Sequence, residues 1–145
     1  MNQIKKRVLS LVKNGAYTEA VTAAADYARR NPMQAECYGL LSHAEAIAGY
    51  TKAAIKTVSQ AIALAPQEPA YRFQRGRLHL QLNALAEALA DMNAVIEIAQ
   101  ALGNADYAAA AAPYRDEALR RLQQPRDHER TTPRSRIAAT AHARA

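Results

Sequence analysis

The chain has 145 residues, half of them apolar, and carries a formal net charge of +6. Alanine accounts for 35 residues, whereas glycine occurs five times, phenylalanine once and tryptophan not at all. This composition favours helices, because alanine loses no side-chain entropy in a helix, and it argues against a large β-barrel or β-sandwich. No apolar run approaches the roughly 20 residues that a bilayer-spanning helix needs, so we expect no membrane span.

The N-terminal residues and the single cysteine indicate a cytoplasmic protein. The basic residues 1–7 are not followed by the apolar segment and small-residue cleavage site of a signal peptide. Cys37 can form no internal disulfide, and one cysteine is too few for a typical metal site. We expect Cys37 to pack as a small hydrophobic side chain and the protein to reside in the cytoplasm.

Several kinds of residue recur at a spacing of 34. Gly15 and Gly49 share this spacing with Asn83, and asparagine can replace glycine at a helix end. Pro32 and Pro66 are also 34 residues apart. Three further columns repeat small or apolar residues: Ala20, Ala54 and Ala88; Val21, Ile55 and Leu89; and Ala28, Ile62 and Ile96. A fixed period of this length indicates a repeat protein.

Each repeat contains two amphipathic stretches separated by its glycine or asparagine. Apolar residues three and four apart predict helices over residues 4–11 and 17–24, then 38–42 and 54–62, then 71–82 and 85–96. The third unit's second helix is expected to continue to residue 102 and stop at Gly103. Ala20, Ala54 and Ala88 are expected where two helices approach closely, because a larger side chain would push them apart.

The pattern resembles the tetratricopeptide repeat (TPR) family over residues 1 to about 100. The resemblance implies an all-α fold, a right-handed α-solenoid of three helical hairpins, with units at about 1–34, 35–68 and 69–102. Arg7, Glu45 and His79 depart from it, since the family usually has apolar or aromatic residues there, and we expect looser packing at the latter two. A simple three-helix bundle is the alternative, but it would not require a period of 34.

A last helix, over about 104–122, is predicted to cap the solenoid and complete a TPR domain at 1–122. Asn104 or Asp106 can cap its start, and its apolar stripe is Tyr107, Ala111, Tyr114, Ala118 and Leu122. Such an element covers the last hydrophobic surface of a repeat array. Pro113 should produce a kink or a restart. Residues 123–145, with five arginines and two acids, are predicted to be a disordered basic tail.

The resemblance also implies a binding groove lined by the first helix of each unit. The groove residues it implies are Asn2, Lys5, Leu9, Val12, Glu36, Gly39, Leu40, His43, Ile47, Phe73, Gln74, Arg77 and Leu80. Apolar patches with Lys5 and Arg77 at opposite ends would suit an amphipathic or partly acidic protein segment. The alternative for Leu9, Val12 and Leu80 is that they belong to the core.

Two TPR subtypes can be compared with these residues. Members that hold the C-terminal carboxylate of heat-shock chaperones use five clamp residues, of which only Lys5 is matched here. The other clamp positions carry Leu9, Leu40, Ala70 and Gln74, so the chain does not resemble that subtype. Small bacterial chaperones for type III secretion translocators are similar in size and in their apolar groove, and they remain a hypothesis.

The sequence contains no convincing catalytic or cofactor motif. The glycines are dispersed and form no phosphate-binding loop, and the histidines lack metalloprotease spacing. Only His43, Glu45 and His79 could converge into a metal or acid–base site, and a position in water on the surface or in the groove explains these polar side chains more simply. We therefore expect no enzyme activity, no cofactor and no metal.

The leading interpretation is a non-enzymatic protein–protein interaction module: an adaptor, a scaffold or a dedicated chaperone. The alternative is binding of nucleic acid or an anionic surface through the arginine-rich tail, which would weaken steeply with salt. Nucleic acid is disfavoured, because the tail has no aromatic residue for base stacking. A homo-oligomer formed through Tyr107, Tyr114 or an uncovered first helix also stays open.

Overall fold

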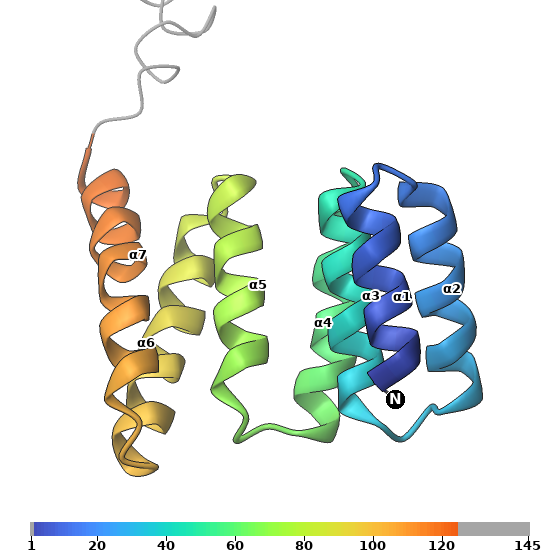
Figure 1. The fold of residues 1–145 in the computed structure, drawn as a ribbon. Helices are drawn as coiled ribbons and strands as arrows, with labels where there is room; N and C mark the ends of the chain where they lie inside the picture. Colours follow the sequence, from blue (N-terminus) through green and yellow to red (C-terminus); the bar gives the residue numbers. More distant parts are fainter. Residues whose placement is uncertain (1, 125–145) are drawn as a thin grey trace, which may run out of the picture.

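The computed structural model describes residues 2–124, with side chains from residue 3 onward, as a succession of seven helices. They are α1 (Asn2–Lys13), α2 (Tyr17–Arg30), α3 (Ala35–Ile47), α4 (Thr51–Leu64), α5 (Pro69–Gln81), α6 (Leu85–Ala101) and α7 (Ala105–Gln123). Figure 1 shows the hairpins α1–α2, α3–α4 and α5–α6 side by side, with α7 on the outer side of the last hairpin. The all-α solenoid with a seventh, capping helix is therefore confirmed. The predicted tail lies outside the described residues from 125 onward.

Left-handed residues end the first helix of each hairpin at the predicted period. The residue that follows each of them donates its backbone N–H back into the helix, as Ala84 does to the His79 carbonyl oxygen at 2.8 Å. This geometry satisfies carbonyl groups that would otherwise lack a partner at the helix end. The residues with positive φ are Gly15 (79°), Gly49 (94°), Asn83 (58°) and Gly103 (70°). Asn83 thus replaces glycine as predicted, and α6 ends just before Gly103.

Small residues allow the two helices of each hairpin to cross closely. Ala20 and Ala54 are fully buried and Ala88 is 1% exposed, as residues at a close helix crossing must be. At the second crossing, the buried Ser42 hydroxyl donates to the backbone carbonyl oxygen of Ala54 at 2.7 Å. A larger residue at any of these alanines would have to displace a neighbouring helix.

The seventh helix covers the apolar face of α6. Its start is capped by Asn104, whose side-chain oxygen accepts the backbone N–H of Tyr107 at 3.4 Å, so Asn104 rather than Asp106 is the cap. Ala111 and Ala118 are fully buried. Of the predicted kink or restart at Pro113, the restart does not occur, because the helix continues through Pro113. Pro113 lies on the exposed side, where water can hydrate the carbonyl it leaves without a partner.

A buried polar cluster joins the second and third hairpins. The Arg75 guanidinium on α5 donates to both carboxylate oxygens of Asp91 on α6, at 2.8 and 2.7 Å, and to the Ser59 hydroxyl on α4 at 3.1 Å. These hydrogen bonds to Asp91 raise the pKa of Arg75. Gly76 leaves room for the cluster, because a Cβ there would lie 2.8 Å from Met92 Cε and 3.1 Å from Asp91 Cβ. The cluster fixes α5 against α4 and α6.

The three departures from the TPR pattern have different surroundings. His79 lies half-buried with its Nε2 3.9 Å from Asp91 Oδ2, at the edge of the polar cluster. Glu45 Oε1 is buried and has no hydrogen-bond partner among residues 3–124. Arg7 is exposed on the outer side of the first hairpin. A charged residue is tolerated at Arg7 because no helix of the described chain packs over it.

Candidate partner-binding groove

The first helices of the hairpins, α1, α3 and α5, share one face of the solenoid (Figure 1). On this face, α3 and α5 lie further apart than α1 and α3 do. The Tyr71 ring lies between them: a Cβ built on Gly39 would come within 2.7 Å of Tyr71 Cε1. Beside it, the Gln74 amide donates to the Ser42 hydroxyl at 3.0 Å. These side chains bridge α3 and α5 and keep them apart, which leaves space along the shared face.

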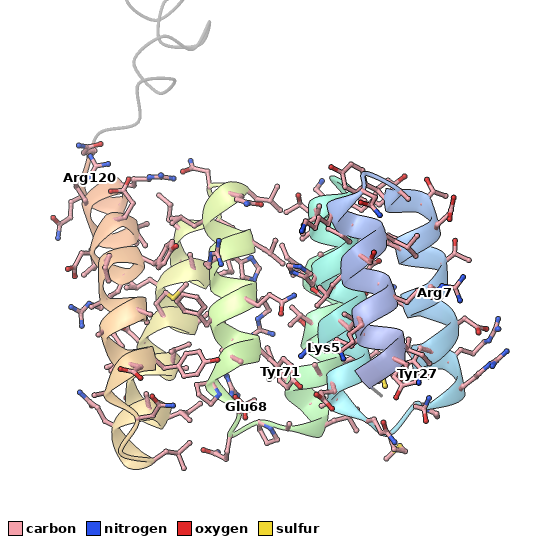
Figure 2. The ribbon with its side chains drawn as sticks, in the orientation of Figure 1. Lys5, Arg7, Tyr27, Glu68, Tyr71 and Arg120 are labelled. Atoms are coloured by element: carbon pink, nitrogen blue, oxygen red, sulfur yellow. The ribbon has the colours of Figure 1, made fainter. Side chains whose placement is uncertain are left out.

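Two adjoining hollows occupy this space. The first has a volume of about 600 Å³ and is lined by Lys5, Leu9, Glu36, Gly39, Leu40, His43, Glu68, Ala70, Tyr71 and Gln74. The second, of about 380 Å³, is lined by His43, Ala46, Ile47, Gln74, Arg77, Leu78 and Gln81. His43 and Gln74 belong to both, so we describe the two hollows together as the groove. Figure 2 shows Lys5, Tyr71 and Glu68 around the space between α5 and the helices α1 and α3.

Most of the residues expected in a groove line it. They are Lys5, Leu9, Glu36, Gly39, Leu40, His43, Ile47, Gln74 and Arg77. Leu9 is 39% exposed and is not a core residue, whereas Val12 packs against the core formed by α1, α2 and α3. Leu80 is half-buried and lines neither hollow. The side chain of Asn2 lies outside the described part of the chain.

Phe73 packs against α7 and lines neither hollow. Its ring meets the rings of Tyr114 and Tyr107 edge-on, with centroids 5.5 and 6.2 Å away. The Arg77 guanidinium lies 5.7 Å from the ring centroids of both Phe73 and Tyr114, within cation–π range. Phe73 therefore holds Arg77 at the edge of the second hollow. The two tyrosines, considered above as a surface for self-association, are half-buried in this packing.

The two ends of the groove carry different charges. Glu36, in the first turn of α3, and Glu68, just before α5, line the first hollow together with Lys5. Arg77 and His43 line the second hollow, whose described lining contains no carboxylate. Burial, and to a lesser degree the Arg77 charge, hold the pKa of His43 below its ordinary value. Arg77 therefore supplies the permanent positive charge at that end.

Sequence reasoning missed several lining residues: Glu68 and Tyr71 in the first hollow, and Ala46, Leu78 and Gln81 in the second. Glu68 lies in the connection before α5, where its carboxylate accepts the backbone N–H of Ala70 at 3.4 Å as an N-cap. The pair Glu68-Pro69 is a recognisable helix start. Tyr71 could not be assigned to the groove from spacing alone, because its side chain is directed there by the absence of a Cβ at Gly39 on another helix.

All five residues at the positions of the carboxylate clamp line the first hollow: Lys5, Leu9, Leu40, Ala70 and Gln74. Only Lys5 is cationic. Leu40 is 8% exposed and part of the core, and Gln74 already donates to Ser42. The hollow thus coincides with the clamp region, but its chemistry is apolar and mixed in charge.

The other chemical candidates are separated. His43 lines the groove, whereas His79 faces Asp91, so the structure does not bring His43, Glu45 and His79 together as one site. Within residues 2–124, no group of three His, Cys, Asp or Glu side chains could hold a metal ion. Cys37 is fully buried, as expected, and this burial raises the pKa of its thiol. None of the seven helices is long and apolar enough to cross a bilayer.

A third hollow, of about 750 Å³, lies outside the groove. It is lined by Arg7 of α1 and by residues of α2: Thr18, Glu19, Val21, Thr22, Ala23, Ala25, Asp26 and Arg29. Arg7 extends toward α2 and away from α5 (Figure 2). Its lining mixes charged and apolar side chains, and it lies on the first hairpin, at one end of the repeat array.

Comparison with known proteins identifies the architecture. No family model and no curated protein matches the sequence. The TPR2B domain of yeast Sti1, solved as its pHsp70 complex, superposes with a TM-score of 0.76 at 18% identity, covering 83% of this chain and 96% of the domain. The fold is that of a tetratricopeptide-repeat domain.

Two bacterial secretion chaperones have the same TPR fold. PcrH, in complex with the chaperone-binding region of PopD, matches with a TM-score of 0.76 at 19% identity, covering 84% of this chain and 92% of that one. The type III secretion chaperone SycD of Yersinia enterocolitica, bound to a peptide of the translocator YopD, matches with a TM-score of 0.74 at 16% identity, covering 84% and 94%. At these identities the likeness establishes the fold.

Proposed function

We propose that this TPR protein is a non-enzymatic chaperone or adaptor that binds a segment of a partner protein in its groove. The observation that carries the proposal is the continuous pair of hollows between α1, α3 and α5, lined by exposed apolar residues beside unpaired charges. Apolar contact area with a few polar groups is the usual composition of a peptide-binding groove. The structures of PcrH, SycD and Sti1 with partner segments support this use of the fold.

Secretion chaperones are the more specific form of the proposal. Coverage of nearly the whole of PcrH and SycD supports it, because this chain has the same extent of helical hairpins. A cytoplasmic location would follow from that role. Binding through the arginine-rich tail gains no support from residues 2–124, because that tail lies almost entirely outside them.

The test begins with affinity capture from the native cell and mapping of the captured protein to a minimal binding segment. The Kd of that segment is then measured by calorimetry for Leu9→Asp and Ile47→Asp, which alter groove side chains that are 39% and 41% exposed. Each should weaken binding about tenfold or more, because a half-buried leucine or isoleucine contact is lost.

Matched controls are Met33→Asp and Leu102→Asp, which change apolar residues that are 78% and 61% exposed and lie outside the groove. They should leave the Kd unchanged. Equal effects of groove and control substitutions, or none from either pair, would show that the segment binds elsewhere.

A further inference from the structure

The groove has a carboxylate-rich end and a cationic end, and both lie along parallel helices. Glu36 and Glu68 stand at the starts of α3 and α5, whereas Arg77, which supplies the permanent positive charge, lies more than two turns further along α5. At 1.5 Å per residue, the nine residues from Glu68 to Arg77 span about 13 Å. The opposite charges are therefore further apart along the groove than the Debye length at physiological salt, which is about 8 Å.

These charged groups are available to a ligand. Lys5, Glu36, Glu68 and Arg77 form no ion pair with any residue of the described chain, unlike Arg75, Arg120 and Arg121. Helix capping accounts for one oxygen of Glu68, which accepts the Ala70 N–H, but α3 has no side-chain cap hydrogen bond to account for Glu36. Arg77 is held in place by the rings of Phe73 and Tyr114, which are apolar groups that leave its charge unneutralised.

From this arrangement we propose that the groove selects a charge-segregated partner segment: an apolar stretch with a basic residue toward the starts of α3 and α5 and an acidic residue toward Arg77. This rests on the proposed function and refines it. Sequence reasoning placed Lys5 and Arg77 at opposite ends and expected a partly acidic partner. In the structure, Glu36 and Glu68 line the same hollow as Lys5, so that end carries a net negative charge.

The spacing of the two charges in the partner follows from the length of the groove. A separation of about 13 Å corresponds to about four residues of an extended segment, at about 3.3 Å per residue. For a segment that binds as a helix, the same separation corresponds to about nine residues. Either spacing satisfies the geometry, and the selected spacing reports the bound conformation.

The test uses a phage-displayed library of random dodecapeptides selected on the purified full-length chain. The selected pool should be enriched in peptides with one basic and one acidic residue at one of these two spacings. Selection on Arg77→Gln should abolish the acidic preference and keep the basic one, and Glu36→Gln with Glu68→Gln should do the reverse. Lys5→Gln should strengthen the basic preference. A representative peptide should lose about three- to fivefold in affinity for each neutralised end, as expected for a partly exposed ion pair.

Matched controls separate this effect from folding and from net charge. Arg7→Gln and Glu97→Gln each remove one exposed charge outside the groove and should leave the pool unchanged. Arg77→Lys keeps the charge and should keep the acidic preference, so it distinguishes a lost charge from a disturbed Phe73–Tyr114 packing. A pool without charge enrichment, or one that is identical for all groove variants, would overturn the charge-segregation proposal. Recovery of no binding peptide at all would instead count against the proposed binding function.

Discussion

Replacing Asp91 by asparagine should substantially destabilise the protein, because Asp91 is the acceptor at the centre of the polar cluster between the second and third hairpins. Its side chain is 6% exposed, and it receives two hydrogen bonds from Arg75 at 2.7 and 2.8 Å. Asparagine has nearly the same volume, so the substitution creates no cavity. It removes the negative charge and one of the two acceptor atoms.

The expected loss can be bounded from the surroundings of Arg75. Breaking a fully buried ion pair costs about 3–5 kcal/mol, chiefly because the remaining charge is left desolvated. Arg75 would keep its hydrogen bond to Ser59 at 3.1 Å, and its side chain is 25% exposed and so partly hydrated. We therefore expect Asp91→Asn to lower the free energy of unfolding by about 2–3 kcal/mol, below the fully buried range.

Urea unfolding followed by circular dichroism measures this loss, and two further variants identify its cause. Arg75→Met combined with Asp91→Leu removes both charges and should recover stability to within about 1 kcal/mol of the wild type, since apolar replacements of similar size are often neutral. Ser59→Ala should cost only about 0.5–1 kcal/mol, as for a single neutral hydrogen bond. A change below about 0.5 kcal/mol for Asp91→Asn, or no recovery in the double variant, would refute the desolvation argument.

Three other predictions concern single positions. Glu45→Leu should raise the free energy of unfolding by about 1–2 kcal/mol in urea titrations, because it removes a buried oxygen without a hydrogen-bond partner, and a loss of stability would contradict this. Asn83→Ala should cost about 1 kcal/mol because its φ is 58°, whereas Asn83→Gly should be neutral or stabilising; equal effects would show that backbone strain is not the cause. The pKa of His43, followed by NMR titration, should lie below its ordinary 6.5, so the stability contributed by its neutral form is present above that pH and falls as the pH drops below it. Arg77→Gln should move this pKa only slightly upward, because burial is the larger cause, and a return to 6.5 would reverse that order of causes.

The repeat architecture was predictable because its signals are local. Gly15, Gly49 and Asn83 recur at the ends of helices, and each needs only its own backbone conformation to be recognised. The buried alanines at 20, 54 and 88 follow from the same period, since the two helices of every hairpin cross in the same way and need a small residue there. The helix does not restart at Pro113, one of the two outcomes predicted there, because tertiary packing of α7 on α6 outweighs the loss of one hydrogen bond.

The groove was predictable in outline, through the family resemblance, but not in its detailed chemistry. Lys5, Glu36, His43 and Arg77 line it at the helix faces that the resemblance implies. Phe73 shares such a face, but its ring turns to α7, because the tyrosines of that helix offer it edge-on contacts. Side-chain direction at an interface between helices depends on partners that a repeat period does not specify.

The amino-acid sequence by itself determined the period, the helix ends and the small residues at helix crossings, since these depend on residues three, four or 34 positions apart and on backbone conformations that few residue types adopt. Only the tertiary structure decided that Tyr71 leans on Gly39, that Arg75 reaches Asp91, and that Glu68 joins Glu36 at one end of the groove. Each of these arrangements brings together residues of two different helices, or of one helix and the connection that precedes another. Each depends on packing, which excludes the other conformations that a flexible side chain could adopt. The sign of the charge at either end of the groove is therefore a property of the packed hairpins.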